Sequence, residues 1–132
     1  VTKIPDTFTS DEVALSMSFS CEVNKENIFK IIGDKIPLIE MSIKDPFDDF
    51  LRAKNQLNEF LMEYRKVKSS LVSKGIKRIH LFAAIPIAFA IGIGQAYNPN
   101  YDPDIITYDF RKGVYSKAIT IGENHGLKQI IK

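Results

Sequence analysis

The chain has 132 residues, of which 45% are hydrophobic and 26% charged, so it suits one globular domain and neither a disordered nor a collagen-like protein. Its 18 basic and 16 acidic residues give a net charge of +2, which is too small to indicate binding to long nucleic acids. The single cysteine, Cys21, excludes an internal disulfide framework.

The single cysteine also favours a reducing compartment, of which the cytoplasm is the simplest. Residues 1–20 show no basic segment followed by an apolar core, as a signal peptide would. The longest apolar run, residues 81–94, is interrupted by Pro86 and falls short of the roughly 20 residues that cross a bilayer, so no membrane segment is expected. Because the chain begins at Val1 rather than Met, we expect a fragment of a longer effector protein.

The first half of the chain predicts two strands and two helices. Residues 13–20 predict a buried strand ending in small residues, residues 25–35 a short helix with an apolar stripe, and residues 38–43 a second strand. Residues 45–73 predict a helix about 40 Å long. Asp45 suits its N-cap, Pro46 its first position, and Gly75 its end.

The second half predicts a strand, a helix and a hairpin. Residues 76–84 form the third expected strand. The segment from Pro86 to Gly94 is apolar nearly all round, so we expect a helix that is buried on most sides. Residues 105–110 and 114–121 predict two further strands, joined by a tight turn at Lys112 and Gly113.

This order of elements predicts an α/β, three-layer, Rossmann-like fold with a mainly parallel sheet and a C-terminal β-hairpin. Ligands of such folds bind beyond the carboxyl ends of the strands. Small residues end the first strand (Ser18, Ser20 and Cys21) and the third (Ala83 and Ala84), where a ligand can approach the backbone. The third strand leads directly into a helix start, whose free N–H groups suit a phosphate.

These residues also carry a family resemblance. Residues 79–94 contain the pattern I-H-L-F-x-A-x-P-x-x-x-A-x-x-x-G, and Tyr108-Asp109 and Tyr115 follow it. The chain resembles the carboxy-terminal half of a SAVED domain from about Val13 onward, although Gln95 stands where the family often has a basic residue. The resemblance implies a CARF-like half of a sensor for a cyclic oligonucleotide messenger, such as a cyclic oligoadenylate, in the CBASS and type III CRISPR systems of anti-phage defence.

The resemblance also implies partners. A SAVED domain is typically joined to an effector (a nuclease, a protease or a TIR domain), and ligand binding promotes oligomerisation that activates it. The expected partners of this chain are therefore the cyclic oligonucleotide, a linked or associated effector, and a second CARF-like half or further copies of the chain.

Each candidate contact has a plainer alternative. The small residues at the strand ends also suit packing, and the Ala84–Pro86 turn also suits a tight connection. Lys25 is more typical of a solvated lysine than of a ligand contact, and Arg111 is more typical of a turn charge than of a phosphate contact. The candidate ligand-binding residues are Ser18, Ser20, Cys21, Lys25, Ala84, Pro86, Ile87, Ala88 and Arg111.

We expect no catalysis, metal or cofactor in this chain. His80 lies within a strand and suits a structural histidine with satisfied hydrogen bonds, and His80, His125 and Cys21 lack the spacing and number of zinc ligands. No Ser/His/Asp arrangement is supported. The alternative is a CARF-like ring nuclease or another Rossmann-like nucleotide hydrolase.

Overall fold

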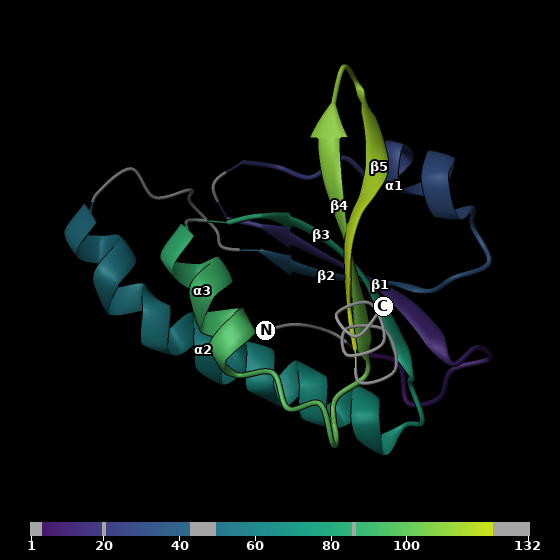
Figure 1. Ribbon diagram of the computed structural model, residues 1–132, viewed down its shortest axis with the longest axis horizontal. Coiled ribbons are helices and arrows are strands. Elements are labelled where there is room, and N and C mark those ends of the chain that lie inside the picture. Colours follow the sequence, from purple (N-terminus) through teal and green to yellow (C-terminus); the bar gives the residue numbers. More distant parts are fainter. Residues whose placement is uncertain (1–3, 20, 43–49, 86, 123–132) are drawn as a thin grey trace, which may run out of the picture.

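The structure is a computed structural model that describes residues 4–19, 21–42, 50–85 and 87–122 (Figure 1). Its elements, in chain order, are β1 (Glu12–Ser18), α1 (Lys25–Ile32), β2 (Leu38–Ser42), α2 (Phe50–Ser73), β3 (Arg78–Ala84), α3 (Ile87–Gln95), β4 (Asp104–Arg111) and β5 (Val114–Ile121). The strands form a 5-stranded sheet in the order β2-β1-β3-β4-β5, in which only β5 is antiparallel. This confirms the predicted α/β fold with its C-terminal hairpin.

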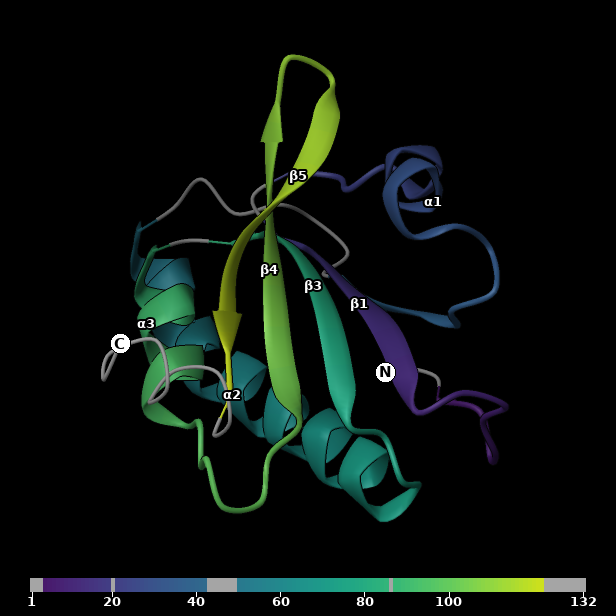
Figure 2. The same ribbon diagram turned by 45° about the vertical axis from the view of Figure 1, so that its right-hand side comes forward.

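The helices cover the sheet from both sides (Figures 1 and 2). Helices α2 and α3 lie on one face and α1 lies on the other. Alternate residues of β1 follow this division, because Val13 and Leu15 belong to the core under α2 and α3 whereas Ala14 faces the α1 side. Strands β1 and β3 are buried along most of their length, as expected for parallel strands covered on two faces.

The ends of α1 and α2 follow from local chemistry. Asn24 caps α1, since its Oδ1 accepts a hydrogen bond from the Glu26 N–H at 2.8 Å. The helix ends at Ile32, earlier than predicted, because Gly33 adopts a positive φ of 78°. Helix α2 is described over 24 residues, about 36 Å, and its predicted N-cap, Asp45, lies outside the described residues.

The prediction that the 86–94 helix is buried on most sides was wrong. Only Phe89 and Ile93, one turn apart, are fully buried in α3, whereas Ile87 is 80% exposed and Ile91 57%. Phe89 and Ile93 pack into the core between the sheet and α2. Gly92 allows the α2 contact, because a Cβ there would lie 2.9 Å from a Leu61 methyl carbon. No helix among the described residues is long and apolar enough to cross a membrane.

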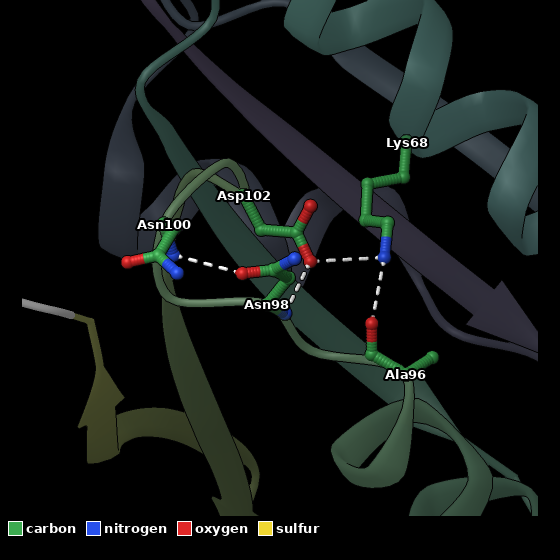
Figure 3. Close-up of polar contacts among 5 residues, drawn as sticks. All are labelled: Lys68, Ala96, Asn98, Asn100 and Asp102. Carbon is green, nitrogen blue, oxygen red and sulfur yellow. Dashed lines mark hydrogen bonds and ion pairs between the residues drawn. The ribbon is translucent and has the colours of Figure 1, made fainter.

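Lys68 of α2 joins three segments on this side of the molecule (Figure 3). Its Nζ donates to the Ala96 carbonyl at 3.0 Å and pairs with the Asp102 carboxylate at 2.9 Å, with side chains only 11% and 7% exposed. Asp102 also accepts from the Asn98 N–H at 2.7 Å. The ion pair therefore fixes the connection between α3 and β4 against α2. Burial raises the pKa of the neighbouring Tyr64, and the Asp102 carboxylate adds to this effect.

Replacing Lys68 by Met is expected to lower the free energy of unfolding by about 3 kcal/mol, because it leaves the buried Asp102 carboxylate without its cation. The measurement is urea denaturation followed by circular dichroism. The matched control is Lys66→Met on the same helix, where the side chain is exposed and a change within about 0.5 kcal/mol is expected. Equal effects of the two variants would contradict the role given to Lys68.

Candidate functional site

The strand order reverses between β1 and β3, and a cavity opens beside the carboxyl ends of these strands. It has a volume of about 270 Å³ and lies on the α1 side of the sheet. We call it the strand-end cavity. Its lining residues are Cys21, Glu22, Val23, Asn24, Asn27, Ala83, Ala84, Tyr108, Asp109, Phe110 and Tyr115. A ligand is expected at such a switch point in an open α/β sheet.

Two hydrogen bonds hold the loop after β1 in place. The Ser18 hydroxyl oxygen accepts from the Val23 N–H at 3.0 Å, and the Phe19 N–H donates to the Ala84 carbonyl at 3.0 Å. The first bond closes the loop on itself, and the second ties it to the end of β3. The loop then delivers Asn24 and the start of α1 to the rim of the cavity.

Aromatic side chains form the opposite wall. Tyr108 stacks on Phe82 with ring centroids 4.4 Å apart and an interplanar angle of 13°. Tyr115 of β5 meets Phe82 edge-on at 4.9 Å and contacts Phe110 at 4.9 Å. The cross-strand partners Phe110 and Tyr115 bring the hairpin's rings over the end of β3. The wall therefore offers aromatic surface against which a planar ring can pack.

The described lining of the cavity carries polar side chains but no basic one. Burial raises the pKa of Tyr108, with the Glu12 carboxylate adding to the shift and Arg78 opposing it. Burial likewise raises the pKa of Tyr115, and Cys21 adds to it. Both phenols therefore stay neutral at physiological pH. Among the described residues, the lining includes the carboxylates of Glu22 and Asp109 and no lysine or arginine, so it suits a nucleobase better than a phosphate group.

The predicted contacts of β1 and β3 meet at this cavity. Cys21 and Ala84 line it, and Ser18 holds its loop. The corner at the end of β3 is open, because Ala83 lines the strand-end cavity and also an apolar cavity of about 310 Å³ on the α3 side. The predictions for Ser20 and Pro86 concern positions outside the described residues.

The other predicted contacts lie away from the lining. Lys25 is exposed and pairs with Glu40 at 3.1 Å, and Arg111 pairs with Asp109 at 3.8 Å near the hairpin tip. Ile87 and Ala88 begin α3 on the opposite face of the sheet and are exposed. Their proposed phosphate contact stays a prediction.

The residues that sequence reasoning missed are mostly those of the hairpin wall and the α1 cap. Tyr108 and Phe110 alternate along β4, which places them on one face of the sheet. Asn24 precedes an apolar helical stripe, a recognisable N-cap position. These signals place the side chains on elements, but only the folded hairpin shows that Tyr108 and Tyr115 meet Phe82. The lining residues that were not predicted as contacts include Asn24, Asn27, Tyr108, Phe110 and Tyr115.

A larger cavity, of about 440 Å³, lies at the amino-terminal edge of the sheet between Asp11, Arg78 and Asp104. Its lining mixes acidic and basic side chains. We assign the candidate site to the strand-end cavity rather than to this one, because parallel α/β sheets bind ligands at the carboxyl ends of their strands. Among the described residues, no group of three or more His, Cys, Asp or Glu side chains is placed to hold a metal ion.

Solved structures share this fold. The Cap4 SAVED/CARF-domain receptor of Acinetobacter baumannii with the cyclic trinucleotide 2'3'3'-cAAA superposes with a TM-score of 0.73 and 22% identity, covering 91% of this chain and 26% of the receptor. The same receptor with 3'3'3'-cAAA superposes with a TM-score of 0.67 and 20% identity, covering 89% of this chain and 26% of the receptor. The Cap4 SAVED/CARF-domain receptor of Moraxella osloensis superposes with a TM-score of 0.62 and 20% identity, covering 89% of this chain and 24% of the receptor.

The fold is thus that of the SAVED/CARF-domain receptors, and this chain spans about a quarter of their length. Residues 2–121 match the family described as "SMODS-associated and fused to various effectors sensor domain". The chain belongs to this SAVED family, as its sequence pattern predicts. No curated protein gives a significant sequence match.

Replacing Ser18 by Ala is expected to cost about 1 kcal/mol of stability, because the Val23 N–H loses its acceptor. Hydrogen exchange at the Val23 amide should accelerate in the same variant. Ser116→Ala, at an exposed position of β5, is the control and should change neither quantity. Unchanged exchange at Val23 would show that Ser18 does not hold the loop.

Proposed function

We propose that this chain is the ligand-binding half of a sensor for a cyclic oligonucleotide, with one base of the ring seated in the strand-end cavity. The observation that carries the proposal is the composition of this cavity, which combines stacked aromatic rings, two asparagine amides and small strand ends at the switch point of the sheet. Proteins bind unpaired bases by stacking on aromatic rings and by hydrogen bonds to base edges.

The ligand class follows from the relatives. The Acinetobacter baumannii Cap4 receptor, which shares the fold, was solved with two cyclic triadenylates of different linkage. Asn27 can offer an adenine both a donor and an acceptor, as an amide does at the adenine edge, and Asn24, whose Oδ1 caps α1, can donate through its Nδ2. We infer a cyclic oligoadenylate-like ligand. Because the described lining is not basic, the phosphates would be held outside the cavity, where Lys25 follows the lining residue Asn24 and Arg111 pairs with the lining residue Asp109.

Titration calorimetry of the full-length protein with 2'3'3'-cAAA and 3'3'3'-cAAA tests this proposal. Replacing Tyr115 by Ala should weaken binding about ten-fold or more, because aromatic stacking on a base contributes about 1–3 kcal/mol. The matched control is Tyr101→Ala, a 75% exposed tyrosine near the opposite edge of the sheet, which should bind as the wild type does. Thermal melting checks that both variants are folded.

Absence of binding to a panel of cyclic di-, tri- and tetranucleotides by the wild-type protein would refute the proposal. Equal affinities of the two alanine variants would instead move the site away from the strand-end cavity. Cleavage of the bound ring on long incubation would favour the ring-nuclease alternative over a sensor without chemistry.

We further propose that the chain works as one CARF-like half within a larger cytoplasmic protein, and that ligand binding promotes an assembly that activates a linked effector. The support is the family, whose description names fusion to various effectors. The sedimentation coefficient of the full-length protein should rise on addition of a saturating cyclic triadenylate. An unchanged coefficient at saturation would contradict ligand-driven assembly.

A further inference from the structure

A line of hydrogen-bonded side chains crosses three strands below the strand-end cavity. His80 of β3 is 7% exposed and occupies the middle of this line. Its Nε2 lies 2.6 Å from Glu12 Oε1 on β1, and its Nδ1 lies 2.8 Å from the Tyr108 hydroxyl on β4. Arg78 Nη1 lies 4.0 Å from the same Glu12 oxygen. The prediction of a structural histidine with satisfied hydrogen bonds is therefore confirmed, but the network also reaches the cavity wall.

Both ring nitrogens of His80 are used in this line. A carboxylate only accepts hydrogen bonds, so His80 donates its Nε2–H to Glu12. The Tyr108 hydroxyl, which can both donate and accept, is hydrogen-bonded to Nδ1 at 2.8 Å. Both ring nitrogens of His80 are thus hydrogen-bonded, and the Tyr108 hydroxyl bonds to His80 rather than to a ligand.

The consequence for the cavity is geometric. The Tyr108 ring is stacked on Phe82 at 4.4 Å, and its hydroxyl is held at the far end of the ring. A tyrosine side chain has two rotatable torsions, and stacking together with an end-on hydrogen bond restrains both. The ring that lines the cavity is thus fixed before a ligand arrives, which lowers the entropic cost of ordering it on binding.

We propose that Glu12 and His80 are positioning residues for ligand binding, which hold the Tyr108 ring in the orientation that receives a base. This inference rests on the proposed function, because it assigns these residues to the cavity in which the base is expected. Neither Glu12 nor His80 lines that cavity, so their effect on affinity passes through Tyr108.

A thermodynamic cycle on the affinity of the full-length protein for 2'3'3'-cAAA and 3'3'3'-cAAA tests the proposal. Loss of one hydrogen bond of this kind corresponds to about a five- to ten-fold change. His80→Leu and Tyr108→Phe should each weaken binding by about that factor, and the double variant should be no weaker than either single one. His80→Gln, which can still accept from Tyr108 and donate to Glu12, should recover most of the affinity.

Tyr101→Phe is the matched control, because it removes a hydroxyl from an exposed ring outside the network. Each variant is measured at a temperature at which circular dichroism shows it folded, so a purely structural role for His80 would leave affinity unchanged. Affinity that is unchanged in His80→Leu, or a loss that adds to that of Tyr108→Phe, overturns the positioning role while the proposed function stands. Failure of the wild-type protein to bind any cyclic oligonucleotide overturns both, and is recognised from the first titration.

Discussion

The parallel pairing of β1 with β3 is the constraint on which the site depends. Its register runs from Glu12 opposite Arg78 to Ser18 opposite Ala84, so both strands end at one level with small side chains. The chain then leaves the two strands toward opposite faces of the sheet, through α1 and α3. A space lined by backbone and small groups results, and the aromatic rings of the β4–β5 hairpin close it from the side. The same register places Glu12 next to His80, from which the hydrogen bonds to Tyr108 begin.

Much of the fold was predictable because hydrophobic periodicity is a local signal. The strands, the long helix and the Lys112–Gly113 turn lie close to their predicted places, and both turn residues have the positive φ that a two-residue hairpin prefers. The burial of α3 was not predictable, since periodicity shows that a helix is apolar but not how many neighbours cover it. Exposed Ile87 and Ile91 are the result.

The candidate site was predictable in part. Cys21 and Ala84 were expected at the strand ends from chain order alone, and the structure brings them to one cavity. The hairpin rings were missed as contacts because their approach to Phe82 depends on how β4 and β5 lie over β3. Ion pairs show the same limit. Lys25 meets Glu40 only because β1 and β2 pair, a contact that sequence spacing does not reveal.

The β4–β5 hairpin is divided by an irregularity in its register. The register of β4 and β5 shifts between Ile106 and Tyr108. There the Thr107 hydroxyl accepts from the Ile119 N–H at 3.1 Å and donates to the Ile119 carbonyl at 3.2 Å. An irregularity of this kind bends a ribbon and interrupts its ladder. The inner half is anchored in the core through Ile105 and Ile106, whereas the outer half carries Phe110 and Tyr115. The outer half of the hairpin therefore meets the buried core through the contact of Tyr115 with Phe82, and any bend at the irregularity would change that contact and the cavity wall together.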